Sequence, residues 1–195
     1  MRGRERGGVL LLTAAFLPLL FAILAFGVDA VQAIEAKASQ ESALQAAQEL
    51  RMAPAITVRA KNSEDPGGLI ARSIMSTLRD EGYEGSVAVW FYEAGPADGL
   101  RDTTRRLYAF ETVVEDRVPT SFARLFGMSE MPVASSFAAS SQPYSEFQTW
   151  RPDSVRNGVF RIEAREVPER MSFTAASLDS MPAALRAEIG ASLEA

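Results

Sequence analysis

The residues that could perform acid–base or metal chemistry are few in this chain of 195 residues. It contains no histidine, the usual proton carrier near neutral pH, and no cysteine, so it has neither a disulfide nor a thiolate metal ligand. Two pairs of carboxylates are adjacent, Asp80 with Glu81 and Glu115 with Asp116. Because adjacent side chains on a helix or strand do not face each other, we interpret both pairs as solvated charges at element ends.

The sequence also lacks the short motifs that usually mark a catalytic or nucleotide site. It has no phosphate-binding P-loop, no G-x-S-x-G nucleophile turn, no G-x-G-x-x-G fingerprint and no cluster with metal-ligand spacing. We therefore expect that the protein is not an enzyme and that it uses no cofactor, metal or small-molecule substrate. An envelope hydrolase is the weakest alternative.

Charge is unevenly distributed along the chain. Arg2, Arg4 and Arg6 with Glu5 give the first eight residues a net charge of +2, whereas the whole chain has −5, so the rest sums to −7. An acidic body is a poor ligand for nucleic acid, because such binding depends on cationic contacts to phosphates. We expect no nucleic-acid partner.

The basic start is followed by 21 uncharged residues, 8–28, and then by Asp29. As a helix this run would measure about 31 Å, close to the roughly 30 Å hydrocarbon core of a bilayer. It is longer than the apolar core of a secretory signal, roughly 7–15 residues, although cleavage after Gly27 is possible. Pro18 lies in the middle of the run, where neighbouring turns of a membrane helix can satisfy the freed backbone groups. We expect a retained anchor, and the positive-inside rule places its N-terminus in the cytoplasm.

Helix-forming residues continue beyond the anchor as a predicted stem. Residues 29–53 contain neither glycine nor proline and include eight alanines, which favours a helix. One helix from Gly8 to Ala53, about 69 Å long, is therefore predicted to end before Pro54. Asp29 either meets an amine of a partner at the membrane edge or only marks the water boundary. The stem has a narrow apolar stripe, suited to packing on the chain's own domain or on a neighbouring helix, at Ala36, Ala43, Ala46, Ala47 and Leu50.

The predicted organisation is therefore an anchor (1–28), a stem (29–53), a linker (54–66) and an exported α+β domain with an antiparallel sheet and covering helices (67–195). In that domain a helix is predicted from Asp65 as N-cap and Pro66 at its first position to Gly82. Runs rich in β-branched and aromatic residues predict strands at 86–92, 106–114, 132–140 and 158–164, the first two antiparallel. The terminal helix is predicted to begin at Pro182.

Two predicted loop regions contain bulky apolar side chains. Residues 119–127 read as a short helix capped by Thr120 or Ser121, in which the apolar side chains have helical spacing. We interpret these side chains, Phe122, Leu125 and Phe126, as core, with docking as the alternative. In the polar loop 140–157, Phe147 and Trp150 are interpreted as a lid on the core or, alternatively, as exposed partner contacts.

Two stretches have a recognisable order of motifs. Residues 4–50 combine an Arg- and Gly-rich start, an apolar span with an internal Leu-Pro-Leu, a Val-Asp at its outer end and an Ala/Gln-rich helix. Residues 108–140 contain a strand, a VPT-F-LFG turn and a second strand. Together these stretches resemble TadE/TadG-like proteins of the Flp (tight adherence, Tad) pilus-assembly system. The positions that carry the resemblance, and that we take as candidate assembly residues, are Gly7, Gly8, Pro18, Asp29, Pro119, Phe122, Phe126 and Gly127.

The resemblance implies a pseudopilin-like component of pilus assembly or secretion with a pilin-like layout, which acts by protein–protein assembly. Its implied partners are the membrane and other pilus-assembly or pseudopilin subunits, bound through the anchor and stem. The implied location is the bacterial inner membrane, with the C-terminal domain periplasmic or extracellular. The alternative function is a secreted or periplasmic binding domain whose signal peptide is cleaved after Gly27.

Departures from the family pattern limit what the resemblance implies. The chain lacks the Asp-x-Ser-x-Ser metal motif of the von Willebrand A domain found in long members, so metal-dependent cell adhesion is not expected. Prepilin-type cleavage after Gly7 or Gly8 would place Leu12 or Thr13 where a glutamate is usual. We therefore expect the anchor to remain uncleaved.

Overall fold

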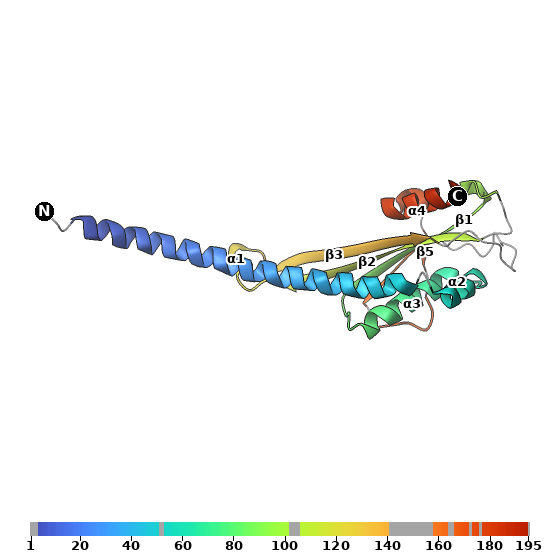
Figure 1. Cartoon of the computed structure of the whole chain (residues 1–195), viewed down its shortest axis with the longest axis horizontal. Helices are drawn as coiled ribbons and strands as arrows, with labels where there is room; N and C mark the ends of the chain where they lie inside the picture. Colours follow the sequence, from blue (N-terminus) through green and yellow to red (C-terminus); the bar gives the residue numbers. More distant parts are fainter. Residues whose placement is uncertain are drawn as a thin grey trace. The chain divides into compact units, whose positions relative to one another are not determined.

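The computed structural model of the chain describes residues 4–50, 53–101, 106–140, 158–163, 166–171, 173–175 and 177–194. Over these residues the protein is α+β: a long N-terminal apolar helix precedes a small antiparallel sheet with helices (Figure 1). The helices are α1 (Arg4–Glu49), α2 (Pro54–Lys61), α3 (Pro66–Asp80) and α4 (Ala183–Glu194). The strands are β1 (Ser86–Ala94), β2 (Leu107–Pro119), β3 (Glu130–Ser140), β4 (Gly158–Glu163) and β5 (Thr174–Ala175). Short 3₁₀ helices are η2 (Pro96–Asp98), η3 (Ala123–Phe126) and η5 (Leu178–Ser180).

The chain divides into two compact units. The first comprises Met1–Ala38 with Asp116–Val133, and the second comprises Ser39–Glu115 with Ala134–Ala195. The first unit therefore contains the apolar run together with the turn between β2 and β3. The second contains most of the sheet and its covering helices.

The sheet has the strand order β3-β2-β1-β4-β5. β1 pairs antiparallel with both β2 and β4, and Phe91 at its centre stands opposite Phe110 on one side and Gly158 on the other. All four predicted strands are confirmed, with ends shifted by up to five residues. Because successive residues of a strand point to opposite faces, β1 contributes side chains to two separate cores.

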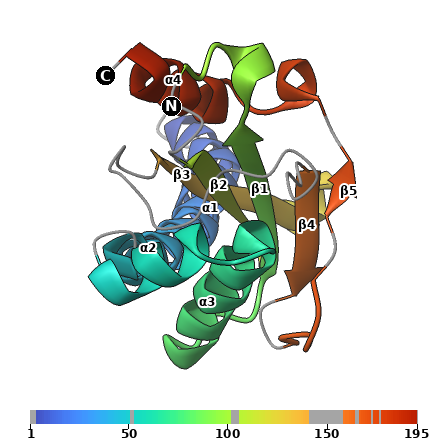
Figure 2. The same ribbon diagram turned by 90° about the vertical axis from the view of Figure 1, so that its right-hand side faces the viewer.

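One face of the sheet is covered by α3 and by the C-terminal part of α1. Three residues of α3 spaced four apart are buried there, together with alternate residues of β1 and three residues of α1. Figure 2 shows α2 and α3 on this side of the sheet and α4 on the other. The buried set includes Ile70, Ile74, Leu78, Val87, Val89, Phe91, Ala43, Leu44 and Ala47. The end of the apolar stripe therefore packs on the chain's own domain.

Local sequence signals determine both ends of α3. Asp65 accepts a hydrogen bond from the Gly68 N–H at 3.1 Å, and Pro66 occupies the first turn. At the other end Gly82 has φ +80° and donates to the Arg79 carbonyl, while the following N–H of Tyr83 donates to Leu78. This is a Schellman ending, which requires a left-handed residue and therefore favours glycine.

The opposite face of the sheet is covered by α4, through Leu185 and Ile189. Glu111 of β2 is buried on this side. Its burial raises the pKa of the carboxyl, although hydrogen bonds from the backbone of Leu185 and from Ser136 lower it in part. Since Leu185 lies in the first turn of α4, Glu111 supplies an acceptor that the helix itself lacks there.

The segment 54–66, expected as a linker, is helical over Pro54–Lys61. The same proline that ends a helix can begin the next, because its fixed φ suits the first helical position. The end of α2 is held by buried Arg106, whose Nη1 donates to the Lys61 carbonyl at 2.9 Å. The rest of its guanidinium binds both carboxylate oxygens of Glu93, at 2.7 and 3.0 Å. The sequence analysis took Pro54 only as the end of the preceding helix, and Arg106 and Glu93, which hold the end of α2, are distant from it in sequence.

Candidate functional site

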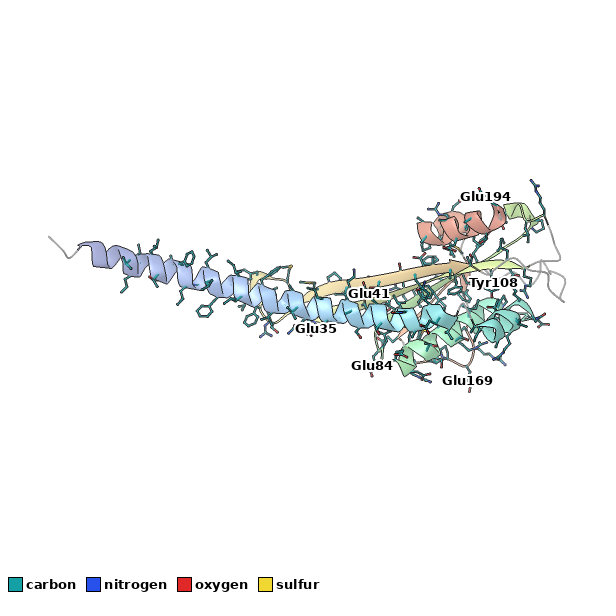
Figure 3. All side chains as sticks on the ribbon, in the orientation of Figure 1. Glu35, Glu41, Glu84, Tyr108, Glu169 and Glu194 are labelled. Carbon is teal, nitrogen blue, oxygen red and sulfur yellow. The ribbon has the colours of Figure 1, made fainter. Side chains whose placement is uncertain are left out.

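In the first unit the side chains of the apolar run are exposed. Leu24, for example, keeps 59% of its surface accessible, and Figure 3 shows side chains projecting outward along this part of α1. By length and composition α1 could cross a membrane, and no other helix among the described residues meets the same test. This agrees with the predicted anchor at the level of a candidate span.

The turn between β2 and β3, residues 119–129, is tightly hydrogen-bonded; we call it the hairpin tip. The Thr120 N–H donates to the Ser129 carbonyl at 3.0 Å, and the Thr120 hydroxyl donates to the Met128 carbonyl. These two hydrogen bonds close the loop that contains η3, which ends at Gly127 with φ +89°. The predicted stop at Gly127 is confirmed, and its left-handed backbone is the physical reason for glycine there.

The carboxylate of Asp29 binds the start of this tip. Its Oδ1 accepts the Ser121 N–H at 2.7 Å, and its Oδ2 accepts the N–H groups of Phe122 at 3.0 Å and Ala123 at 2.6 Å. The side chain is almost fully buried, with 1% exposure. The predicted cap by Thr120 or Ser121 was wrong: the hydroxyl of Thr120 is used elsewhere, and an acidic side chain from α1 caps the turn instead.

The electrostatics of Asp29 favour the ionised carboxylate. Burial acts to raise its pKa, but the N–H donors of Ala123, Ser121 and Phe122 and the charge of Arg124 together lower it below the usual aspartate value. Asp29 is the first residue after the apolar run, so a charge is held where the run ends. Its partners are backbone groups of its own chain, rather than only water or a partner's amine as we expected.

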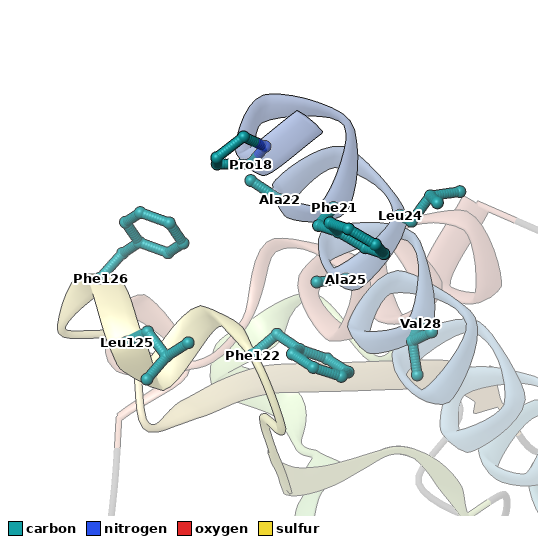
Figure 4. A pocket seen from close by; sticks show the side chains of 9 residues that line it. All are labelled: Pro18, Phe21, Ala22, Leu24, Ala25, Val28, Phe122, Leu125 and Phe126. Carbon is teal, nitrogen blue, oxygen red and sulfur yellow. The ribbon is translucent and has the colours of Figure 1, made fainter. Parts of the chain in front are cut away.

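A groove of about 480 Å³ lies between α1 and η3 in the first unit. Its lining is entirely apolar: Pro18, Phe21, Ala22, Leu24, Ala25, Val28, Phe122, Leu125 and Phe126. Figure 4 shows the side chains of the tip along one side and those of α1 along the other. Phe122, Leu125 and Phe126 are 40%, 77% and 74% exposed, so their interpretation as core was wrong. Helical spacing predicts a common face, but only the surroundings decide whether that face is covered.

The structure brings four of the eight candidate residues, Pro18, Asp29, Phe122 and Phe126, into this site. Pro119 ends β2 at the start of the tip, and Gly127 ends η3. Gly7 and Gly8 lie near the start of α1, away from the groove, and a Cβ at Gly8 would meet nothing within 4 Å. Phe147 and Trp150 lie outside the described residues.

Sequence reasoning missed Phe21, Leu24 and Val28 as lining residues, and interpreted Leu125 as core. The available signal was weak, since nearly every residue of the run is apolar and residue type does not single out the lining positions. The arrangement offers a backbone-capping carboxylate and an apolar surface, which suit binding rather than proton transfer. Within the described residues no three potential metal ligands are grouped together.

Comparisons with models of protein families, with curated proteins and with solved structures find no match for this chain. The resemblance to TadE/TadG-like proteins thus depends on the motifs in the sequence.

Proposed function

We propose that this chain is a membrane-anchored, pseudopilin-like component of a Flp/Tad-type pilus-assembly or secretion system. It is held in the bacterial inner membrane by residues 8–28 as a single pass, with the N-terminus in the cytoplasm and the sheet domain outside. It acts by protein–protein assembly, in a pilin-like layout, and its partners are other subunits that bind the anchor and stem.

The observation that carries the proposal is the binding of Asp29 to the backbone of residues 121–123. Asp29 belongs to the first family-like stretch and residues 121–123 to the second, and they are 92 to 94 positions apart. The first stretch alone is moderately specific, because any alanine-rich anchor shares part of it. The three N–H groups bound by this carboxylate support a single shared role, because they give each motif a structural reason to accompany the other.

Two further features support a membrane location. The run 8–28 leaves large apolar side chains exposed, which is costly in water and favourable in a bilayer. The net +2 at its amino end and the acidic chain beyond it follow the charge asymmetry of an anchor with a cytoplasmic N-terminus.

The proposal is tested by deleting the gene and complementing the deletion. We expect loss of surface pili, or of the secreted material if the system only secretes, and recovery with the wild-type gene. Asp29→Ala should restore assembly poorly. Glu35→Ala is the matched control, because Glu35 is an exposed carboxylate on the same helix (Figure 3) and should restore assembly fully. Normal piliation and secretion in the deletion strain would refute this function.

A further inference from the structure

We propose that the hairpin tip is a second membrane contact: it lies in the hydrocarbon layer beside the anchor, and lipid acyl chains fill the groove between them. This inference rests on the proposed function in one respect, namely that residues 8–28 span a bilayer. It adds an interaction surface that neither the anchor nor the stem supplies.

The groove lies beside the second half of the apolar run of α1. One side of the groove is formed by residues of the apolar run, from Pro18 to Val28. Ten helical residues correspond to about 15 Å, which is half of a hydrocarbon core of roughly 30 Å. If the run spans the bilayer, its groove-lining part lies in the leaflet on the Asp29 side. The tip residues that face it lie at the same level (Figure 4).

The surface of the tip is suited to lipid. Leu125 and Phe126 expose about three quarters of their surface, and Met128 exposes half. Arg124 is the only charged residue between Pro119 and Ser129. Its long side chain can reach the headgroup region while its stem stays in apolar surroundings.

The backbone hydrogen bonds of the tip are also compatible with an apolar medium. In hydrocarbon an irregular turn is tolerated only if its polar backbone groups have partners, since no water is present to bind them. In the tip, seven backbone N–H groups donate to partners within the chain: those of Thr120, Ser121, Phe122, Ala123, Leu125, Gly127 and Met128. Asp29 accepts three of them, so its carboxylate makes the turn compatible with an apolar medium.

Charged residues reappear on both strands just beyond the tip. Arg117 of β2 and Glu130 of β3 form an exposed ion pair at 3.6 Å. In the proposed arrangement this pair lies outside the apolar layer, on the same side of it as Asp29. The apolar side chains of the tip are thus followed on both strands by charged ones, a pattern that fits a bilayer interface. On both the hairpin and α1, charged side chains thus follow directly after the apolar residues, as expected where a protein leaves a bilayer.

The test uses single-cysteine variants, which are available directly because the chain has no cysteine. The full-length protein is spin-labelled at Leu125→Cys and placed in nanodiscs of phosphatidylethanolamine and phosphatidylglycerol. Collisions of the label with oxygen, which concentrates in lipid, are compared with collisions with a water-soluble nickel chelate. Leu24→Cys serves as the lipid reference, and Ile34→Cys, exposed on α1 beyond Asp29, serves as the reference outside the apolar run.

We expect the oxygen-to-nickel ratio at Leu125→Cys to match that at Leu24→Cys and to exceed that at Ile34→Cys. Preferential access to nickel at Leu125→Cys would overturn the proposal, and so would protection from both reagents, which would indicate a protein covering the tip. If Leu24→Cys itself meets nickel, the anchor and the tip contact both fail; if only Leu125→Cys does, the proposed function is untouched. Adding Asp29→Asn should shift the ratio at Leu125→Cys toward water, and an unchanged ratio would overturn the role given to Asp29.

Discussion

Two buried carboxylates in this protein accept hydrogen bonds from distant backbone groups. Asp29 accepts three N–H groups at the start of the hairpin tip, and Glu111 accepts the backbone of Leu185 in the first turn of α4. Both carboxylates satisfy donors that a helix or turn leaves open at its N-terminal end. Their pKa values move in opposite directions. At Asp29 the three N–H donors and the charge of Arg124 together outweigh burial, whereas at Glu111 burial outweighs the donors.

Replacing Asp29 by asparagine should speed hydrogen exchange at Ser121, Phe122 and Ala123, because the amide has one acceptor oxygen and no charge. Exchange is measured by mass spectrometry on the full-length protein in nanodiscs, with Glu35→Gln as the control that should leave it unchanged. In the wild type the lowered pKa means that the protection is complete above the unfolded value, about 3.9, and is lost as the pH falls through the lower folded value. Equal exchange in Asp29→Asn and the wild type would contradict the cap.

Glu111 should show the opposite dependence on pH. Its raised pKa means that its contribution to stability is complete below the unfolded value, about 4.3, and is lost as the pH rises through the folded value. Glutamine resembles the neutral carboxyl, so the free energy of unfolding of Glu111→Gln relative to the wild type should increase from pH 4 to pH 8. Denaturant unfolding in detergent at several pH values measures this difference. A constant or falling difference would show that the carboxylate is not penalised in the fold.

A control for this experiment lies on the same strand. Glu115 is partly exposed and pairs with Arg161 at 3.1 Å. Surface pairs of this kind contribute little, so Glu115→Gln should lower the free energy of unfolding at pH 7 by no more than about 1 kcal/mol.

At the scale of elements, the same residue type has different roles in different helices. Gly67 in the first turn of α3 faces two aromatic rings: an added Cβ would lie 2.8 Å from Phe173 Cε2 and 2.9 Å from Phe91 Cδ1. Gly190 of α4 has nothing within 4 Å of the corresponding position. The close approach of α3 to the sheet therefore depends on glycine, whereas α4 has room for a side chain.

The two glycines form a matched pair of substitutions. Gly67→Ala should lower the free energy of unfolding by about 1–3 kcal/mol, the usual cost of overpacking a core. Gly190→Ala should raise it by about 0.5–1 kcal/mol, because alanine loses less conformational freedom in a helix. Denaturant unfolding of the wild type and both variants in the same detergent measures these changes in the free energy of unfolding. Destabilisation of similar size at both positions would mean that packing against Phe91 and Phe173 is not the cause.

At the scale of the whole molecule, the state of the N-terminus decides whether the groove is complete. With the run 8–28 intact, the groove keeps both of its sides. Cleavage after Gly27 would remove the side formed by Pro18 to Ala25 and leave Phe122, Leu125 and Phe126 facing water.

We therefore expect the protein purified from its own membranes to begin at or near Met1. Edman or mass-spectrometric sequencing of the N-terminus measures this. A start at Val28 in the soluble fraction would favour the secreted binding domain. A start at Gly8 or Val9 would instead indicate prepilin-type processing and a subunit that can be extracted into a filament.

The sequence by itself determined the features that depend on neighbouring residues. The cap and stop of α3, the positions of four strands and the stop at Gly127 follow from local composition and backbone preference, and all are found in the structure. The long first helix is also found, but α1 ends at Glu49, before the predicted end next to Pro54. Only the tertiary structure decided the features that join distant segments. These are the binding of Asp29 to residues 121–123 and the hydrogen bond from Arg106 to the end of α2. It also decided that Phe126 is exposed, although its spacing suits a core. Periodicity shows which residues share a face, but burial and hydrogen bonding depend on what the folded chain places opposite that face.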